Sequence, residues 1–203
     1  MTLRYEDVLA NLRAWYDGEA ADRDGMVKQR FKLDERAAFL DRLRAVEASS
    51  LLEVGAGTGQ DSVYFRDAGL DVVAVDLSPE MVRRCTEKGI KALVRDVKRL
   101  DLPPNSFDAV WAMNCLLHVP DADLPQVLRE IRSVLRPGGL FYVGLWGGRP
   151  AEGVPAADER FFSFRGDRQV FAAVHEMFEV IDFHTIEDEG NHFQALTAVR
   201  PLD

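Results

Sequence analysis

The stretch that decides the fold is Leu51-Leu52-Glu53-Val54-Gly55-Ala56-Gly57-Thr58-Gly59-Gln60-Asp61. Residues 50–54 predict a short buried strand, and the three glycines that follow predict a turn that opens a helix. Glycines in such a turn permit positive backbone angles and remove side chains that would hold a nucleotide away from the backbone amides. The pattern indicates a nucleotide-binding α/β unit, but it is common by itself, so its weight depends on the rest of the chain.

Strands and helices alternate along the chain after this stretch. Short apolar runs predict further strands at 71–75, 90–94, 107–113 and 140–146. Apolar residues that recur every three or four positions predict helices at 59–68, 79–88 and 121–135. Strands that alternate with helices in this way imply a parallel sheet.

The two ends of the chain differ from this alternation. Residues 1–24 and 33–48 predict helices ahead of the first strand. Extended runs at 178–186 and 192–199, joined by the acidic turn 187–191, predict a β-hairpin. We expect a single domain over 1–203, with a helical lid at 1–48, a ligand-binding core at 49–146, and a substrate-side insertion with the hairpin at 147–203.

Charge and hydropathy restrict the partners of the chain. Among its 203 residues, 25 basic and 34 acidic side chains give a net charge of −9, and no basic run could track phosphates. We therefore expect no nucleic-acid partner. No segment reaches the roughly 18 consecutive apolar residues of a membrane span, and the N-terminus lacks a secretion signal. We expect a cytoplasmic protein with no membrane partner.

Several kinds of chemistry find no support in the sequence. Cys85 and Cys115 lie far apart among aliphatic residues and are interpreted as small buried hydrophobes. The four histidines show no ligand spacing with cysteine or carboxylate residues, so we predict no metal site. Neither a Gly-x-Ser-x-Gly elbow nor a phosphate loop ending in Gly-Lys-Ser/Thr is present, which argues against a hydrolase and a nucleoside triphosphatase.

Acidic residues stand at the ends of two predicted strands. Asp76 follows the glycine-rich turn by about twenty residues, where its carboxylate would accept hydrogen bonds from both hydroxyls of a ribose. Asp96 follows the next strand. A ribose-binding acid at this spacing gives the glycine-rich turn more weight.

In order and spacing, these motifs resemble the class I S-adenosylmethionine-dependent methyltransferases, of the methyltransferase-11/25-like small-molecule type, over roughly residues 33–203. Residues 53–59 resemble the first motif of that family, 74–81 its acidic ribose-binding motif and 95–97 its adenine-edge motif. Residues 135–140 look like the turn into its fifth strand. The resemblance implies an α/β Rossmann-like fold: a seven-stranded, mostly parallel sheet of order 3-2-1-4-5-7-6, with the last strand antiparallel and helices on both faces.

The resemblance also implies a cofactor, S-adenosyl-L-methionine, with S-adenosyl-L-homocysteine as its product. Glu53 would orient the methionine ammonium, and Arg30 would hold the methionine carboxylate as the lid closes. Leu77 and Met81 would sandwich the adenine, and Asp96 would accept from its exocyclic amine. The full cofactor-binding set implied in this way is Glu53, Gly55, Ala56, Gly57, Gly59, Asp76, Leu77, Met81, Asp96, Val97, Asn114 and Arg30.

The segment 112–120 leaves the fourth strand at the carboxyl edge of the sheet, where ligands of open α/β folds bind. His118 is a candidate catalytic base because the intrinsic pKa of histidine lies near neutrality, and a packing or orienting role is the alternative. Methyl transfer relies on alignment and desolvation, so it does not require a dedicated base. Substrate-pocket candidates, which could equally be packing residues, are Tyr5, Tyr16, Trp146 and Arg160.

The sequence therefore predicts a methyltransferase that acts on a small-molecule acceptor, as a monomer or homodimer. Residues 114–117 lack the Asn-Pro-Pro-aromatic arrangement that grips a flipped base, which disfavours DNA. Two other functions stay open: a non-catalytic sensor of S-adenosylmethionine or S-adenosylhomocysteine, and an NAD(P)-dependent oxidoreductase. Gln60, in place of the third glycine of a dinucleotide fingerprint, and the closing hairpin argue against the oxidoreductase.

Overall fold

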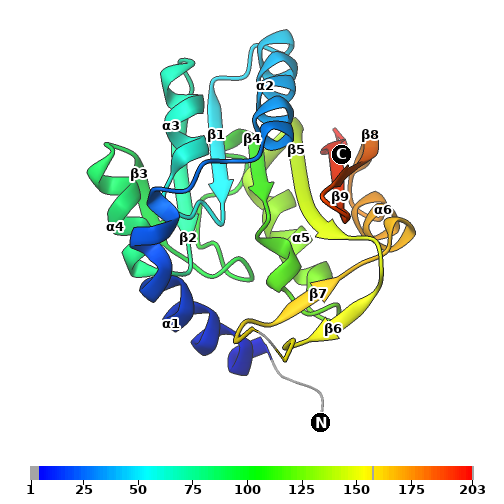
Figure 1. Cartoon of the computed structure of the whole chain (residues 1–203). Coiled ribbons are helices and arrows are strands. Elements are labelled where there is room, and N and C mark those ends of the chain that lie inside the picture. Colours follow the sequence, from blue (N-terminus) through cyan, green and yellow to red (C-terminus); the bar gives the residue numbers. More distant parts are fainter. Residues whose placement is uncertain (1–4, 157, 203) are drawn as a thin grey trace.

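A seven-stranded sheet forms the centre of the molecule (Figure 1). The structure is a computed structural model that describes residues 5–156 and 158–202. The first five strands of the chain, β1 to β5, are parallel to one another, and β9 is antiparallel to both β5 and β8. The spatial order β3-β2-β1-β4-β5-β9-β8 confirms the predicted order and its antiparallel ending. The strands of this sheet are β1 (Ser50–Val54), β2 (Asp71–Asp76), β3 (Lys91–Val94), β4 (Phe107–Met113), β5 (Leu135–Gly147), β8 (Glu179–Asp188) and β9 (Asn191–Val199).

Helices cover both faces of the sheet, as predicted (Figure 1). Successive side chains of β1 point to opposite faces, so Leu51 packs toward α2 and α3, whereas Leu52 and Val54 pack toward α5 and α6. Because both faces are buried, the central strands β1, β2 and β4 are mostly apolar rather than alternating, whereas the edge strand β8 alternates between half-buried and exposed residues over much of its length. The helices are α1 (Tyr5–Asp24), α2 (Arg30–Ala45), α3 (Gln60–Asp67), α4 (Pro79–Glu87), α5 (Leu124–Val134) and α6 (Asp167–His175).

The first helix is placed differently from the others. α1 lies beyond the carboxyl ends of the parallel strands and beside α4 (Figure 1). Its apolar residues Val8 and Leu12 pack on Phe161 rather than on the sheet. α1 thus closes the edge of the sheet where open α/β folds bind ligands. Within the described residues, neither α1 nor any other helix combines the length and apolar character needed to span a bilayer.

An aromatic cluster fixes α2 on the sheet. The Phe39 ring of α2 lies 5.3 Å from the Trp111 ring and 5.6 Å from the Tyr142 ring, and these two rings stack at 4.0 Å. Phe65 of α3 lies 5.4 Å from Trp111. The side chains of the cluster are buried, so they join two helices to two strands.

The structure contains elements that the sequence analysis did not predict. α6 lies between the fifth strand and the hairpin, and β6 (Ala151–Gly153) pairs with β7 (Phe162–Phe164) in a small antiparallel sheet. A 3₁₀ turn at Leu116–His118 follows β4. Elements this short show little periodicity, so the apolar pattern does not distinguish them from loops.

The predicted hairpin is confirmed, with a shorter turn than expected. β8 and β9 remain paired as far as Asp188 and Asn191, so Glu189 and Gly190 form the turn. Both have positive φ, 50° and 80°, as a two-residue type I′ turn requires. Most of the acidic link therefore belongs to the strands.

Replacing Phe39 with alanine removes the ring that joins α2 to the sheet. We expect this to lower the free energy of unfolding by about 3–5 kcal/mol, because transfer energy is lost and a cavity remains. Urea unfolding followed by circular dichroism measures the change. The control variant Ala37→Ser, on the exposed side of the same helix, should change the free energy of unfolding by less than about 0.5 kcal/mol. A similarly small loss for Phe39→Ala would show that the cluster does not hold α2.

Candidate active site

A cavity of about 440 Å³ lies between the carboxyl ends of the parallel strands and α1. Its walls come from the glycine-rich turn, the ends of β2, β3 and β4, α1 itself and the joint between α1 and α2. This volume is within the range of sites that hold a cofactor or small molecule. The cavity therefore occupies the edge of the sheet that the sequence analysis singled out.

The three glycines of the turn differ in what a larger side chain would contact. A Cβ on Gly55 would lie 2.2 Å from the Cβ of Cys115, and a Cβ on Gly59 would lie 2.8 Å from the Sγ of Cys85. A Cβ on Gly57, where φ is 55°, would meet nothing within 4 Å among the described residues. Gly55 and Gly59 are thus required for packing of the turn against the two cysteines, whereas Gly57 leaves its space to the cavity.

Asp76 fixes this turn from the end of β2. Its Oδ2 accepts a hydrogen bond from the Gly57 amide at 2.8 Å, and its Oδ1 accepts one from the Ser78 amide at 2.9 Å. Burial raises the pKa of Asp76 to about 6, against the lowering effect of these amides. At neutral pH the group is mostly ionised, and because a carboxylate accepts about four hydrogen bonds, it can still accept from two hydroxyl groups.

Asp96, after β3, lines the same cavity with Val97 and Leu77. Its Oδ1 accepts hydrogen bonds from the Tyr5 hydroxyl of α1 and from the Lys98 amide. Burial, followed by the contact with Asp96, raises the pKa of Tyr5 above its usual value, so the phenol remains a donor. Asp96 Oδ2 has no hydrogen-bond partner within the described part of the chain and remains available to a ligand.

Two side chains that line the cavity, Glu53 and Asn114, have oxygen atoms that can accept hydrogen bonds from a ligand. Glu53 is 3% exposed and accepts from the Ser62 hydroxyl. Burial and the neighbouring Asp61 raise the pKa of Glu53 well above its usual value. Asn114, held at φ 55°, has a buried side-chain oxygen without a hydrogen-bond partner among the described residues. An ammonium donor in the cavity would satisfy either group.

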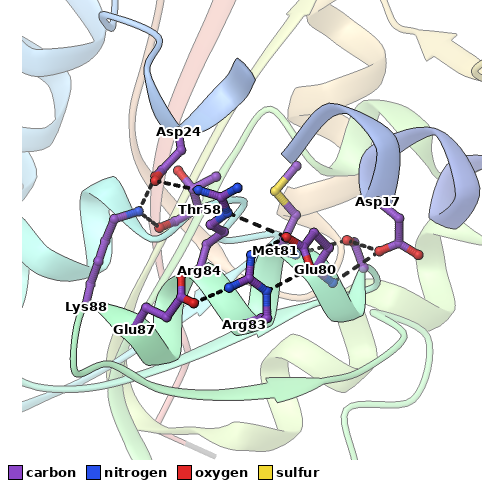
Figure 2. A network of polar contacts seen from close by, with 10 residues as sticks. Asp17, Asp24, Thr58, Glu80, Met81, Arg83, Arg84, Glu87 and Lys88 are labelled. Carbon is purple, nitrogen blue, oxygen red and sulfur yellow. Dashed lines mark hydrogen bonds and ion pairs between the residues drawn. The ribbon is translucent and has the colours of Figure 1, made fainter. Parts of the chain in front are cut away.

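Polar contacts hold α1 against α4 (Figure 2). Asp17 of α1 accepts a hydrogen bond from the Ser78 hydroxyl at 2.5 Å, at the start of α4. At the end of α1, Asp24 pairs with Lys88 and, at 3.4 Å, with Arg84. α1 is therefore anchored to both ends of α4, which keeps it over the cavity.

His118 lines the cavity, but both of its ring nitrogens have partners. Nδ1 donates to the Phe161 carbonyl at 2.8 Å, since a carbonyl only accepts, and Nε2 accepts from the Tyr16 hydroxyl at 2.6 Å. Burial lowers the pKa of His118 to about 4, with smaller lowering effects from Arg160 and Arg23. The imidazole is therefore neutral at pH 7 and orients the Tyr16 hydroxyl.

Some of the predicted site residues do not line the cavity: Gly59, Arg30, Trp146 and Arg160. The Arg30 side chain is 85% exposed and pairs with Asp34 at 3.0 Å. Arg30 does not line the cavity with the other cofactor-binding candidates, and its role in holding the cofactor carboxylate stays a prediction. Its position at the exposed start of α2 directs it to solvent.

Trp146 and Arg160 contribute to packing around the site rather than to the cavity wall. The Trp146 ring packs against the Phe193 ring at 5.2 Å, edge to face. Arg160 pairs with Asp158 at 2.6 Å and reaches the site only through the Tyr16 hydroxyl, at 3.4 Å. Tyr5 and Tyr16, the other two substrate-pocket candidates, do line the cavity.

The sequence analysis missed the cations contributed by the joint between α1 and α2. Arg23, Lys28 and Lys32 all line the cavity. Lys28 pairs with Asp61 at 2.6 Å. The only signal in the sequence is a local excess of basic residues around Gly25 in an acidic chain, and their spacing follows no motif.

A mostly parallel seven-stranded sheet with an antiparallel β9, a glycine-rich turn after β1 and a carboxylate at the end of β2 define a class I methyltransferase fold. Residues 52–143 match the family model described as a methyltransferase domain. Over these residues the chain is similar to the class I S-adenosylmethionine-dependent methyltransferases, and the whole chain has their fold.

Curated relatives share part of their length with this chain. The 2-methyl-6-phytyl-1,4-hydroquinone methyltransferase of Synechocystis sp. is 34% identical over 113 residues, which cover 53% of this chain and 35% of that protein. The ubiquinone biosynthesis O-methyltransferase of Xanthomonas campestris pv. campestris is 31% identical over 144 residues, 68% of this chain and 58% of that protein. The chain thus spans between 35% and 58% of the length of these relatives.

Solved structures show the same fold. The 1,6-didemethyltoxoflavin-N1-methyltransferase of Burkholderia thailandensis, with bound 1,6-didemethyltoxoflavin and S-adenosylhomocysteine, is similar over 99% of this chain and 92% of that chain, with a TM-score of 0.79 and 24% identity. The N-methyltransferase NodS of Bradyrhizobium japonicum, in complex with S-adenosylhomocysteine, is similar over 94% of this chain and 99% of that chain, with a TM-score of 0.73 and 16% identity.

The cofactor of this family is S-adenosylmethionine, and the residues present fit it. Asp76 keeps acceptor capacity for the ribose hydroxyls, and the open space beside Gly57 lets a ligand approach the backbone. The buried Glu53 and the unpaired oxygen of Asn114 suit the methionine ammonium. The cavity thus offers acceptors where the cofactor has donors.

Alanine at Gly55 and at Gly57 separates packing from ligand binding. Gly55→Ala drives a methyl group into Cys115, at about 1–3 kcal/mol, and with φ 68° it also carries a left-handed backbone cost of about 1–2 kcal/mol, so we expect it to lower the free energy of unfolding by about 2–5 kcal/mol. Gly57→Ala fills open cavity space and adds only the left-handed backbone cost of about 1–2 kcal/mol. We expect Gly57→Ala to raise the dissociation constant of S-adenosylmethionine about tenfold or more, the equivalent of about 1.4 kcal/mol.

Urea unfolding and calorimetric titration measure these two effects. Cys115→Gly is the matched control: combined with Gly55→Ala, it removes the contacting atom and should recover part of the lost stability. No recovery, or unchanged cofactor affinity in a folded Gly57→Ala protein, would contradict the assignment of these two glycines.

Proposed function

We propose that this protein transfers a methyl group from S-adenosylmethionine to a small-molecule acceptor in the 440 Å³ cavity. The observation that carries the proposal is that this cavity is lined both by the cofactor motifs and by a second group that those motifs do not use, Tyr16, Arg23 and His118. When bound, the cofactor supplies a methyl group on a sulfonium, which an acceptor lone pair displaces in line. The names of the relatives, which refer to a hydroquinone, to ubiquinone biosynthesis and to a toxoflavin precursor, support a small-molecule acceptor.

In this proposal, the cofactor lies along the carboxyl edge of the sheet. Asp76 holds the ribose hydroxyls, and Asp96 and Leu77 contact the adenine. Glu53 and Asn114 face the methionine ammonium. The remaining cofactor-binding candidates that line the cavity are Gly55, Ala56, Gly57, Met81 and Val97.

α1 excludes water from the reacting groups in this proposal. Tyr5, Leu9, Leu12 and Tyr16 of this helix line the cavity, so the helix covers cofactor and acceptor together. We propose a single domain in which residues 1–48 act as the lid, 49–146 bind the cofactor and 147–203 support the acceptor side. A closed lid keeps water out of the site, which strengthens the electrostatic contacts there. The acceptor is then held in line with the methyl group instead of being hydrated.

We propose His118 as a positioning residue for Tyr16 rather than as the base. Both ring nitrogens are occupied, and the low pKa of the imidazole makes it a weak proton acceptor at neutral pH. The Tyr16 hydroxyl donates to His118, so its oxygen is left as an acceptor toward the cavity or toward Arg160. We propose that the methyl acceptor is aligned next to the Tyr16 hydroxyl.

Asp76→Ala should abolish binding of S-adenosylmethionine and S-adenosylhomocysteine while the protein remains folded. Because Asp76 also accepts from two backbone amides, Asp76→Asn is a second variant that keeps the side-chain volume. We expect Asp76→Asn to weaken binding by about 1.5–3 kcal/mol, the typical contribution of hydrogen bonds to a charged group.

Calorimetry on the wild type and both variants measures this, with circular dichroism as the check on folding and nicotinamide dinucleotides titrated in parallel. Unchanged affinity in the folded variants would remove Asp76 from the ribose site. Binding of the dinucleotides alone would overturn the proposed reaction.

His118→Asn should leave turnover within about threefold of the wild type, since loss of a general base typically costs about 10²–10⁴-fold. The acceptor for this assay comes from a small-molecule screen. The pKa of His118 lies at about 4, so His118 does not titrate between pH 5 and 8. We therefore expect the pH profile of kcat to be the same for the wild type and the variant over this range. A loss of about hundredfold or more, together with a lost inflection, would restore His118 as the base.

A further inference from the structure

Two cations that line the cavity have no carboxylate partner. Arg23 comes from the end of α1 and Lys32 from the first turn of α2. Within the described residues neither forms an ion pair, and the buried Nε of Arg23 has no hydrogen-bond partner. Burial is the main cause that lowers the pKa of Lys32 to about 8; repulsion from Lys28 and Arg23 also lowers it, and attraction to Asp188 and Asp61 opposes them. Both unpaired cations therefore belong to the wall of the same cavity.

None of the carboxylates that line the cavity forms an ion pair with Arg23 or Lys32 within the described residues. Asp61 pairs with Lys28 at 2.6 Å and with Arg36 at 2.8 Å. Asp76 accepts from backbone amides, and Asp96 accepts from Tyr5. The positive charges of Arg23 and Lys32 are thus left for a ligand, and a buried cation without a counter-charge is costly.

The surroundings of these cations are aromatic and neutral. The Arg23 guanidinium lies 5.3 Å from the ring centroids of both Trp15 and Tyr16, and the Lys32 ammonium lies 4.9 Å from the Trp146 ring. Tyr16 in turn donates to the neutral His118. Arg23, Lys32, Tyr16 and His118 together form an electropositive wall of the cavity, and the rings of Trp15 and Trp146 lie beside its two cations.

We infer that the acceptor is an acidic small molecule bound as an anion, and that Arg23 and Lys32 recognise its ionised group, a carboxylate or an acidic hydroxyl. The inference rests on the proposed function, because it names the acceptor class of the same cavity. Guanidinium and ammonium donors form strong charge-assisted hydrogen bonds with anionic oxygens. The chain as a whole carries a charge of −9 and the cavity is also lined by acidic residues, so the unpaired positive charge is confined to the part of the cavity around Arg23 and Lys32.

An acceptor that arrives ionised has no proton to lose. Where the anionic oxygen is the methyl acceptor, its lone pair forms the new bond to carbon, the electron pair of the broken sulfur–carbon bond stays on sulfur, and no proton is released. The positive groups that help to make His118 a poor base, Arg23 among them, also favour the ionised form of such an acceptor. The site therefore needs no base.

The methionine carboxylate of the cofactor is a second anion that the cavity must hold. One cation is enough to neutralise it, and Arg23 and Lys32 are two, so a positive charge remains for the acceptor. The experiment has to separate these two anions.

Calorimetric titrations of the wild type, with and without S-adenosylhomocysteine, test anion recognition. The probes are two matched pairs: 4-hydroxybenzoate with 4-hydroxybenzamide, and 4-nitrophenol with 4-nitrobenzyl alcohol. At pH 8 we expect the anion of at least one pair to bind about tenfold more tightly than its neutral partner. Equal or weaker binding of both anions would overturn the inference. Failure of S-adenosylhomocysteine to bind would instead overturn the proposed function, while the titrations without it still report anion recognition.

Charge-removing variants assign the two cations. Arg23→Gln and Lys32→Met should each weaken the preferred anion about tenfold, whereas Arg42→Gln, on the same helix as Lys32 and paired with Asp182, should not. S-adenosylhomocysteine and 5′-methylthioadenosine, which lacks the amino-acid part, serve as cofactor probes. A variant that weakens only S-adenosylhomocysteine assigns its cation to the cofactor carboxylate and overturns its role for the acceptor.

Discussion

The Asp76 carboxylate is the group on which the geometry of the site depends. It accepts from the Gly57 amide in the turn after β1 and from the Ser78 amide at the start of α4, so one charge fixes two loops. Ser78 then donates to Asp17, which continues the same chain of contacts into α1. Backbone amides offset part of the cost of burying this charge, which keeps it ionised at neutral pH. The glycine-rich turn, the start of α4 and the lid therefore share one support.

Negative and positive charges enter the cavity from different parts of the chain. Glu53 and Asp61 come from β1 and α3, at the base of the glycine-rich turn, whereas Arg23 and Lys32 come from either side of the joint that follows α1. Asp61 is neutralised within the protein, by Lys28 and Arg36, whereas the buried Glu53, whose pKa is raised to about 8, holds its proton at neutral pH. The ammonium group of a ligand would favour the ionised form of Glu53, and an anionic group would complement Arg23 and Lys32. This arrangement matches a zwitterionic amino-acid part beside an anionic partner.

Local patterns were sufficient to predict the sheet, because each strand is a short apolar run that helices bury on both faces. The order of the strands came from the family resemblance, and Asp76 was found by its spacing from the turn. The cavity could not be predicted in the same way. Its lid is held by contacts such as Tyr5 with Asp96 and Asp17 with Ser78, which join residues far apart in sequence and leave no periodic signal. Arg30 was predicted at the site and Lys32 was not, because no motif in the sequence marks which of the basic residues near the start of α2 faces the cavity.

In the proposed function, α1 takes part both in enclosing the cofactor and in recognising the acceptor. Tyr5, near its beginning, contacts the adenine-edge residue Asp96, and Tyr16 and Arg23, toward its end, belong to the electropositive wall. Because the helix is anchored to α4 by Asp17 and Asp24, these residues move together or not at all. A change of acceptor specificity through α1 therefore has to preserve the contacts that close the cofactor site. The Lys32 side chain, in the first turn of α2, forms none of these anchoring contacts within the described residues, so a substitution there changes the charge of the cavity without releasing α1 from α4.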